Sequence, residues 1–334
     1  MFSSDDLGEP SKRESTLVVV VRVATDCSLG CQHCGFSRDL SFFRREIDTS
    51  TLINLGASLQ SIQEGSNQRV LVSWLGGEPF QWTALREMTM RFKNEFGLAL
   101  SVTSNGLPLA SDSVRSFALG HFNEITISID GLEPHHDLMR SCPGMFQRLK
   151  RIVDQIHRER SSTRTRLRVN TVLTEFNASS FPEFCRKMAH WGFDELTFNP
   201  LGGNDRPDFF AKHRLTLAQI IELSTNLDRI REECLDMGLV IRGGAGYLNR
   251  LVATARSERI PVDDCKPGKS FLFVDEQGRV SPCSFTCGTL GIPVDQWIAE
   301  GAGKSADDFL RRKRLIRPVA CEDCLATNVF DKFT

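Results

Sequence analysis

The sequence predicts an α/β fold, a partial, TIM-like (β/α)6 barrel whose parallel sheet carries helices on its outer side. Two observations lead to this prediction. Six nearly continuous apolar, β-branched runs alternate with amphipathic segments of helix length, as is typical of buried parallel strands. A polar or glycine-rich segment directly follows each run, at the carboxyl ends of strands where barrels collect their chemistry. Six repeats are too few for a closed eight-stranded barrel, so we expect an open one.

The predicted strands are 17–23, 70–74, 98–103, 124–129, 167–173 and 195–199. The predicted helices between them are 50–64, 83–96, 111–119, 145–160 and 179–191, followed by a long helix over 216–237 and a short strand over 239–242. We expect three parts: a flexible N-terminal tail at 1–15, a barrel domain at 16–240 and a small C-terminal domain at 241–334. The last begins with a β-hairpin over 271–274 and 279–281, turned by the glycine at 278.

Composition excludes several classes of protein. With 334 residues and a formal net charge of −1, the chain has no bulk charge that would attract nucleic acid or a membrane surface. The longest apolar run, at 17–21, is far short of the roughly 20 residues that a membrane span needs. The tail lacks an apolar signal core, so a cytoplasmic protein is expected.

Eleven cysteines are many for a chain expected in a reducing compartment, so metal binding or catalysis is the first question. Three of them lie within 27–34 and five within 265–324. The remaining Cys142, Cys185 and Cys234 are scattered and are interpreted as small buried hydrophobic residues.

The first group, Cys27-x3-Cys31-x2-Cys34, places three thiolates in one short loop after the first strand. A structural iron–sulfur or zinc site normally takes four ligands, so a cubane cluster held here would keep one iron open to another molecule. The alternative is a zinc knuckle with His33 as the fourth ligand. Adjacent His33 and Cys34 would have difficulty reaching one tetrahedral metal, and zinc would not explain the glycine-rich segments.

This cysteine motif resembles the signature of the radical S-adenosylmethionine (SAM) superfamily, with His33 where an aromatic residue commonly lies beside the adenine. The motif Gly76-Gly77-Glu78-Pro79 is similar to the family's GGE motif. The resemblance implies a [4Fe–4S] cluster whose open iron binds SAM and whose electron cleaves it to methionine and a 5′-deoxyadenosyl radical. It also implies that Glu78 and the neighbouring backbone, including Gly76 and Gly77, bind the methionyl ammonium group.

The segment from Ser128 to Phe146 resembles the one that follows the fourth strand in family members with auxiliary clusters. The resemblance implies that Ser128 and Arg140 hold the ribose and carboxylate of SAM. The alternative is that Ser128 ends a strand and Arg140 pairs with Asp137.

Four further positions are candidates for contact with SAM or the substrate. Ser104 and Asn105 are placed to approach the ribose or the substrate, although an ordinary turn is the alternative. Asn170 and Leu201 are candidates for the adenine side.

The second cysteine set, Cys265, Cys283, Cys321 and Cys324, resembles the "twitch" domain, the shortened relative of the SPASM domain. The resemblance implies a second, auxiliary [4Fe–4S] cluster with four thiolates and no open iron. A zinc ribbon is the alternative, because Cys-x2-Cys is also typical of zinc sites. Cys287 does not fit the frame: it replaces a ligand, donates a hydrogen atom to a substrate radical, or is simply a buried cysteine.

The function expected from the resemblance is oxidation or epimerisation of a small polar substrate, such as an aminocyclitol, a sugar or a nucleoside-linked sugar. Barely 16 residues precede the first strand, too few for the leader-binding domain that peptide maturases often carry. A peptide maturase is the second hypothesis, and a non-catalytic metal scaffold is the third. A flavodoxin- or ferredoxin-type electron donor is expected.

Candidate catalytic residues near the substrate are Cys287, Tyr247 and Arg242, with Asp205, Arg206 and Asp275 in further plausible loops. The sequence does not choose among the acid–base candidates.

Overall fold

The computed structural model describes residues 15–66, 68–160, 165–202, 206–260, 270–302, 311–312, 315–322 and 324. Its strands are β1 (Ser15–Ala24), β2 (Gln68–Gly76), β3 (Ala99–Ser104), β4 (Glu124–Ser128), β5 (Arg166–Leu173), β6 (Glu195–Pro200), β7 (Val240–Ile241), β8 (Phe271–Val274), β9 (Arg279–Ser281) and β10 (Ile292–Pro293). They form one sheet in the order β10-β9-β8-β1-β2-β3-β4-β5-β6-β7. From β8 through β1 to β7 all neighbours run parallel, and β9 and β10 are antiparallel.

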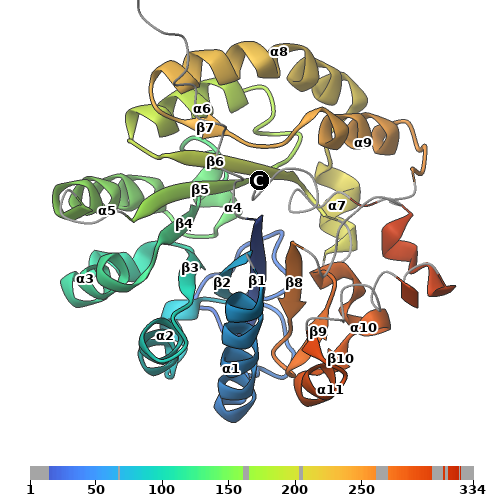
Figure 1. Ribbon diagram of the computed structural model, residues 1–334. Coiled ribbons are helices and arrows are strands. Elements are labelled where there is room, and N and C mark those ends of the chain that lie inside the picture. Colours follow the sequence, from blue (N-terminus) through green and yellow to red (C-terminus); the bar gives the residue numbers. More distant parts are fainter. Residues whose placement is uncertain are drawn as a thin grey trace, which may run out of the picture.

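The helices are α1 (Thr49–Gly65), α2 (Leu85–Asn94), α3 (Asp112–His121), α4 (His135–Met139), α5 (Met145–Arg160), α6 (Phe181–His190), α7 (Pro207–His213), α8 (Leu217–Asp236), α9 (Ala245–Ala255), α10 (Cys287–Leu290) and α11 (Val294–Ala299). Short 3-10 turns lie at Pro79–Gln81, Leu107–Ala110, Ser284–Thr286 and Val319–Cys321. Figure 1 shows the sheet curving into an open barrel with the long helices around its outside. No helix in the described part of the chain is long and apolar enough to cross a membrane.

The two faces of the sheet have different side chains because successive residues of a strand point to opposite sides. On β1, Val19 and Val21 belong to the large core that includes Leu52 and Leu55 of α1. Val18, in contrast, belongs to a smaller cluster with Phe271 and Phe273 of β8. The outer face is therefore packed under helices, and the smaller cluster marks the inner face. The predicted α/β partial barrel is confirmed, with strand ends within a few residues of those expected.

The C-terminal strands are joined to the barrel more closely than the sequence suggested. Strand β8 pairs in parallel with β1, from Val18↔Phe271 to Val21↔Val274, and so extends the barrel sheet. All four residues of β8 are buried, which a hairpin standing away from the barrel would not allow. Where the barrel domain ends and a C-terminal domain begins stays a prediction.

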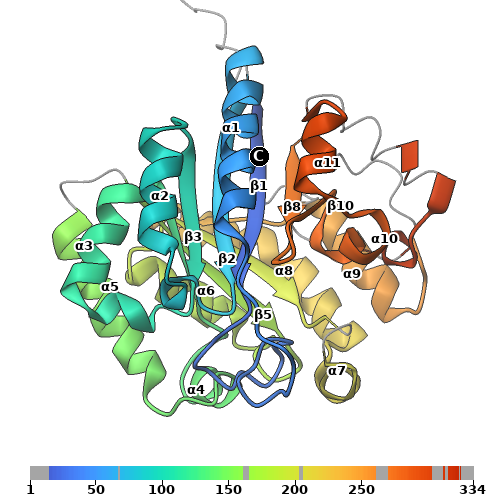
Figure 2. The same cartoon turned by 90° about the horizontal axis from the view of Figure 1, so that it is seen from below.

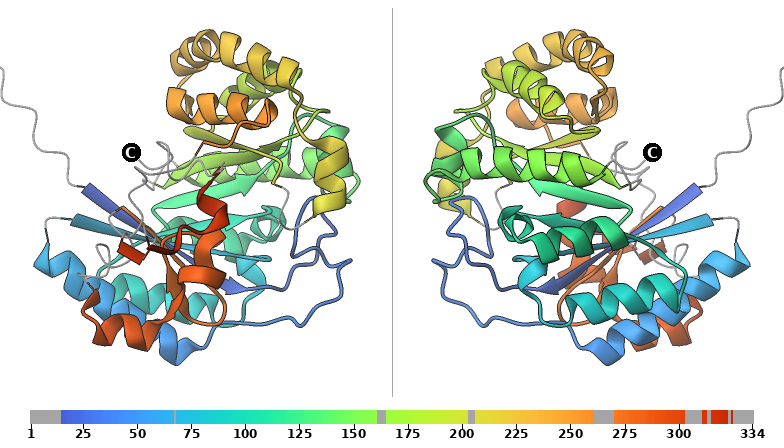
Figure 3. Two further views of the ribbon diagram at one scale, coloured as in Figure 1. Left: turned by 90° about the vertical axis from the view of Figure 1, so that its right-hand side faces the viewer. Right: turned by 90° about the vertical axis from the view of Figure 1, so that its left-hand side faces the viewer.

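Loops that follow the carboxyl ends of the strands gather at one end of the barrel. Figures 2 and 3 show the segment between β1 and α1 at this end, together with α4 and α7. The first residues of β2, β4, β5 and β6 lie at the opposite end, because these strands are parallel. We call the two ends the carboxyl end and the amino end.

Candidate active site

The loop between β1 and α1 carries the first cysteine group. Cys31 is buried, while Cys27 and Cys34 are half-buried. A turn brings the last two together, since the Cys34 N–H donates to the Cys31 carbonyl at 3.3 Å. The Phe36 N–H donates to the Cys34 sulfur, also at 3.3 Å. The loop thus presents three soft sulfur donors over a few residues.

The same loop is held in shape by Arg44, a residue that the sequence analysis did not single out. Its guanidinium donates to four backbone carbonyls, those of Thr25 (2.8 Å), Phe36 (3.0 Å), Ser37 (2.8 Å) and Leu40 (3.2 Å). The first of these carbonyls precedes Cys27 in the chain, and the other three follow Cys34. A single side chain therefore ties the start of the cysteine loop to its end.

The three thiols fit a cluster of iron and sulfide. Burial is the main cause that raises the pKa of Cys27 to about 11. A backbone hydrogen bond lowers this pKa in part, and the nearby Glu78, Cys31 and Cys34 raise it. Burial likewise raises the pKa of Cys31, although Arg140 opposes this. Such crowded thiols ionise when a cationic group compensates their charge, which iron ions do. Three thiolates would leave the fourth iron of a cubane for another ligand.

Gly76 and Gly77 bring the end of β2 against the beginning of the cysteine loop. The Gly77 N–H donates to the Ala24 carbonyl and the Glu78 N–H to the Asp26 carbonyl, both at 2.8 Å. A Cβ atom would lie 2.4 Å from the Ala24 oxygen at position 76 and 2.0 Å from the Asp26 oxygen at position 77. Only glycine allows the two backbones to approach so closely at these positions. This close approach places Glu78 beside Cys27.

The Glu78 carboxylate is fully buried and is surrounded by neutral donors. One oxygen accepts from the Ser104 hydroxyl (2.9 Å) and the Phe80 N–H (3.2 Å), and the other accepts from the Asn105 N–H (2.8 Å). Burial raises the pKa of Glu78 to about 7 despite these bonds. Ser104 and Asn105 thus lie in the site, where they donate to Glu78. Their side-chain oxygens also accept from the Gly106 and Leu107 N–H groups of the following turn, both at 2.9 Å. A carboxylate without a cation is suited to receive an ammonium group.

A second buried carboxylate, Asp130, follows β4 and was not assigned a role from the sequence. Arg140 pairs with it, Nε to Oδ2 at 2.7 Å, and lies 3.9 Å from the Cys31 sulfur. The backbone N–H of Val172 donates to its other oxygen at 3.0 Å. Burial alone would raise the pKa of Asp130, but the charges of Arg140 and His33 hold it at about 2. The alternative, a pairing of Arg140 with Asp137, is wrong, because Asp137 instead accepts the N–H groups that begin α5.

His33 lies beside Asp130, with its Nε2 atom 3.9 Å from Oδ2. Burial lowers the pKa of His33 to about 4, so the ring is neutral at pH 7. Among the described residues, its Nδ1 atom and the Nε2 atom of His135 are buried without a hydrogen-bond partner. Unsatisfied ring nitrogens at the carboxyl end fit a bound molecule with polar edges, such as SAM.

Other predicted residues at this end face the interior of the barrel or its wall. Ser128 is half-buried on the inner side of β4 and pairs in register with Asn170 of β5. The Asn170 side-chain oxygen accepts from Thr197 (2.8 Å) and from Asn199 (3.0 Å). Leu201 is buried, and its N–H donates to the Leu173 carbonyl at 2.9 Å.

The second cysteine set lies near the C-terminal strands and α9. The Cys283 sulfur is 3.4 Å from the Thr286 hydroxyl, and Cys324 lies close enough to Tyr247 to affect its pKa. Cys265 lies outside the described residues. Among the described residues, no three His, Cys, Asp or Glu side chains lie close enough together to hold one metal ion. This is also true of Cys27, Cys31 and Cys34. The auxiliary cluster therefore stays a prediction.

Cys287 lies on the inner face, in the cluster with Val18, Phe271 and Phe273. Its sulfur is 3.0 Å from the Ser281 hydroxyl. Burial raises the pKa of Cys287 to about 11, while Ser281 and nearby Arg22 lower it in part.

Arg22 is a further residue of this region that the sequence analysis missed. It leaves β1 on the inner face, with its guanidinium 4.6 Å from the ring centre of Phe36 and 5.0 Å from that of Phe273. It also pairs with Glu276 at 3.1 Å. It thus links the first cysteine loop to the β8–β9 hairpin.

Two predicted catalytic residues do not lie at this end. Arg242 donates to Glu195, the first residue of β6, at 3.0 Å. Strand β7 has only two residues, so the chain leaves the sheet before it reaches the carboxyl end. Tyr247 is fully buried in α9 against Phe198, and burial raises its pKa well above the ordinary value. We therefore correct both expectations: Arg242 lies at the amino end, and Tyr247 is part of the core.

The remaining loop candidates are divided. Arg206 precedes α7, and its positive charge contributes to the lowered pKa of His33. Asp275 is buried in the β8–β9 turn, where it accepts from Arg279 at 2.8 Å. Asp205 lies outside the described residues.

Fold and site together define a partial parallel barrel with a three-cysteine loop and a glycine–glutamate motif at its carboxyl end. Comparison with known families agrees: residues 21–164 match the family model of the radical SAM superfamily. Residues 21–164 are thus similar to a radical SAM domain, and members of that superfamily use a SAM-binding [4Fe–4S] cluster and SAM.

Similar proteins extend this likeness over most of the chain. The AdoMet-dependent heme synthase of Methanosarcina barkeri is 20% identical over 286 residues, which cover 80% of this chain and 76% of the relative. The structure of anSMEcpe with bound AdoMet has a TM-score of 0.65 at 15% identity, covering 92% of this chain and 88% of that one. Streptococcus suis SuiB bound to its precursor peptide SuiA has a TM-score of 0.62 at 15% identity, covering 95% and 76%.

Proposed function

We propose that this chain is a radical SAM enzyme that abstracts a hydrogen atom from a small polar substrate held on the inner face of the barrel. Cys27, Cys31 and Cys34 would hold the cluster, which supplies the electron that cleaves SAM. Glu78 would bind the methionyl ammonium group, and Arg140 with Ser128 would face the carboxylate and ribose. Bound SAM would supply the 5′-deoxyadenosyl group that accepts the substrate hydrogen atom.

The lining of the inner face supports a polar substrate. At the carboxyl end the inward side chains of Thr103, Ser128, Asn170 and Asn199 are polar and only half-buried. Inward side chains from β1 and β8 are mainly apolar, apart from Arg22. Polar groups on one wall and apolar groups on the other are typical of sites that orient a small molecule.

The observation that carries the type of reaction is the position of Cys287. Its thiol lies on the inner face beside Ser281 and near Arg22. In an epimerisation, this S–H would give its hydrogen atom to the other face of the substrate radical. The sulfur radical left on Cys287 would then take one electron and one proton from the reducing system. An oxidation would instead pass an electron to an acceptor, which the resemblance assigns to the auxiliary cysteines.

The test uses the reduced, anaerobic enzyme with SAM and a panel of sugars, aminocyclitols and nucleosides in deuterium oxide. An epimerase that uses Cys287 transfers one solvent deuterium to each product molecule. C287A is expected to keep forming 5′-deoxyadenosine but to lose the deuterated product, while C234A, on the outer helix α8, behaves as the wild type. A deuterium-free oxidised product, with C287A fully active, would show that the reaction is an oxidation.

A peptide substrate is the second candidate, and the structural neighbours favour it. SuiB is bound to its precursor peptide, and anSMEcpe was also solved with the Cp18Cys peptide. For this chain the alternative predicts that peptides, and none of the small molecules, increase 5′-deoxyadenosine formation. Mass loss or crosslinking of such a peptide would replace the small-molecule proposal.

A further inference from the structure

The amino end of the barrel holds a cavity that the proposed reaction does not use. Its volume is about 230 Å³. Its lining includes Thr16, Arg69, Glu124, Arg166 and Glu195, each the first or second residue of its strand. The SAM motifs follow the last residues of the same strands, so the cavity lies at the opposite end of the sheet.

Arginine and glutamate side chains that line this cavity form ion pairs with one another. Arg168 donates to Glu124 at 2.7 Å and also contacts Glu195. Arg166 pairs with Glu124 at 3.2 Å, and Arg242 with Glu195 at 3.0 Å. The two carboxylates thus each serve two guanidinium groups, and Glu195 and Arg168 are buried.

Arg69 adds a fourth guanidinium to the same lining. It is exposed, and no ion pair or hydrogen bond joins its side chain to another described residue. Four arginines therefore line the cavity against two glutamates, which leaves an excess of two positive charges in the described lining. Like charges around one partly buried space repel each other more strongly than they would in water.

A bound anion would relieve this repulsion, and guanidinium groups are suited to oxyanions because they donate parallel hydrogen bonds. The size of the cavity restricts the choice. At about 230 Å³ it is smaller than the roughly 300–1,000 Å³ typical of sites for drug-sized ligands, but larger than a single phosphate needs.

We propose that this arginine-lined cavity binds a small oxyanion, of the size of phosphate or a short dicarboxylate, as a site separate from the SAM site. The proposal goes beyond the proposed function and does not rest on it. Arg69 and Arg166, the more exposed arginines, contact the entering anion, and Arg168 and Arg242 form the deeper wall.

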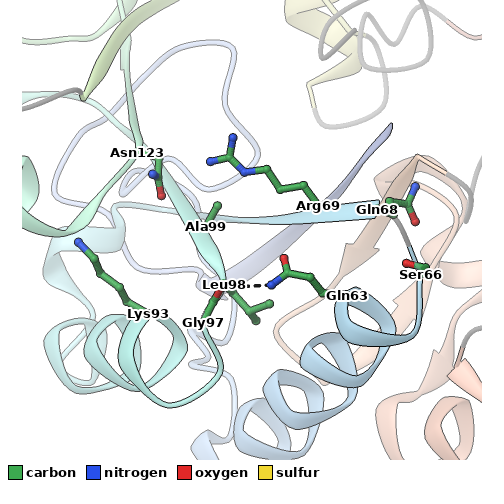
Figure 4. Close-up of a pocket in the computed structure, with 9 residues that line it drawn as sticks. All are labelled: Gln63, Ser66, Gln68, Arg69, Lys93, Gly97, Leu98, Ala99 and Asn123. Carbon is green, nitrogen blue, oxygen red and sulfur yellow. Dashed lines mark hydrogen bonds between the residues drawn. The ribbon is translucent and has the colours of Figure 1, made fainter. Parts of the chain in front are cut away.

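Arg69 lies in the lining of this cavity. This residue also lines a wider neighbouring pocket of about 510 Å³ with Gln63, Lys93 and Asn123. In Figure 4 the Arg69 side chain extends from β2 towards Asn123. The Gln63 amide is occupied by the Gly97 carbonyl at 3.2 Å, and Lys93 by the Gly120 carbonyl at 2.8 Å. Of the two cations in the described lining of this pocket, Arg69 is the one that also lines the smaller cavity.

The first test is calorimetric titration of the full chain with inorganic phosphate and, separately, with succinate, at low ionic strength where screening is weak. Saturable one-to-one binding of either probe is expected, and the tighter of the two identifies the type of oxyanion. Chloride at matched ionic strength is the reference. Absence of saturable heat with both probes up to millimolar concentrations overturns the proposal.

Two variants and a control locate the site. R69A and R166Q are each expected to weaken binding by about tenfold or more, because each removes a charge-assisted hydrogen bond. R91A removes an exposed arginine of α2 that pairs with Glu95 at 3.1 Å, and should change binding less than about twofold. Equal affinity of R69A, R166Q and the wild type overturns the proposal.

Chemical protection gives a measurement without mutation. Phenylglyoxal modifies accessible arginines, and peptide mass spectrometry reports each one. The bound probe should slow modification of Arg69 and Arg166 and leave Arg91 unchanged. Equal slowing at all three positions, or at none, contradicts a site in this cavity.

Discussion

The two ends of the barrel bury carboxylates in opposite ways. Glu78 at the carboxyl end is fully buried, and its described partners are the neutral donors Ser104, Asn105 and Phe80. Glu195 at the amino end is 4% exposed and lies between two arginines, Arg168 and Arg242.

This difference gives each end its own chemistry. Burial disfavours the ionised form of Glu78, and the neutral donors around it compensate its charge only in part. The pKa of Glu78 is therefore raised to about 7. Such a group favours a cationic ligand. At the amino end, the carboxylates are already shared among guanidinium groups and the excess charge is positive. The same sheet thus favours an ammonium group at one end and an oxyanion at the other.

The largest expected effect comes from removing a thiol at the carboxyl end. C31A should lose the absorption and the iron that belong to the SAM-binding cluster of the reconstituted protein. 5′-Deoxyadenosine formation should fall by more than about a hundredfold, beyond the 10–100-fold cost of losing a supporting contact. Iron content and product release measure both effects.

The control is C234A, which removes a buried thiol of α8 far along the chain from the cysteine loop. It should keep the absorption and the rate. A C31A protein with full iron content would show that Cys31 is not a ligand.

The next prediction compares the two buried carboxylates directly. E195Q removes the anion that the buried Arg168 and the half-buried Arg242 share, while Arg168 keeps its pairing with Glu124. The free energy of unfolding should fall by about 3 kcal/mol. E78Q removes a carboxylate whose pKa is raised, so its ionised form costs stability once the pH rises through about 7. At pH 8, E78Q should therefore unfold with an unchanged or higher free energy. Denaturant titration of the cluster-free proteins measures both.

SAM-dependent activity should show the reverse order. E78Q is expected to weaken SAM binding by about tenfold, since a charge-assisted bond to the ammonium group is lost. E195Q should change SAM binding less than about twofold while it remains folded. If E195Q impaired SAM binding as much as E78Q, the two ends would not be independent.

Much of this carboxyl end could be predicted from the sequence. Nearly continuous apolar runs that alternate with helical segments predicted the parallel strands, and parallel strands place their following loops at one end. This reasoning correctly brought Glu78, Ser104 and Ser128 to the same end of the sheet. It did not show that Ser104 and Asn105 would contact Glu78, because side-chain contacts across neighbouring strands depend on register.

Charged residues were the main failures of prediction. Arg22, Arg44 and Asp130 each look like solvated surface residues in the sequence, and their roles depend on carbonyls, rings or charges far along the chain. Arg242 was expected near the substrate, but β7 ends after two residues, and strand length is poorly specified by so short an apolar run. The pairing of β8 with β1 joins residues more than 250 positions apart, a contact that no local pattern predicts.

A smaller effect is expected from Arg44, which acts on the cysteine loop through its backbone. R44A removes donors to four carbonyls and should lower cluster occupancy after reconstitution, with a loss of about 2 kcal/mol in loop stability. Its neighbour Arg45 is a matched control, since its described side-chain contact is the ring of exposed Phe43 at 4.8 Å. R45A should reconstitute as the wild type does. Equal iron content in R44A and R45A would assign the loop's shape to other contacts.

The smallest expected effect is a pH dependence at His136, behind the Asp130 carboxylate. The Asp130 N–H donates to the His136 Nδ1 atom at 3.0 Å, which requires that nitrogen to be unprotonated. Burial, and then the charge of Arg140, lower the pKa of His136 from 6.5 to about 4. The stability from neutral His136 is therefore complete above pH 6.5 and is lost as the pH falls towards 4, by about 1.4 kcal/mol at pH 5.5. H136N keeps an acceptor near the Nδ1 position but does not titrate, so the difference in unfolding free energy between pH 7 and pH 5.5 should shrink by that amount. An unchanged difference in H136N would place the acid sensitivity at another group. The control is H190N, which replaces an exposed histidine at the end of α6 and reports the effect of losing a titratable histidine in general.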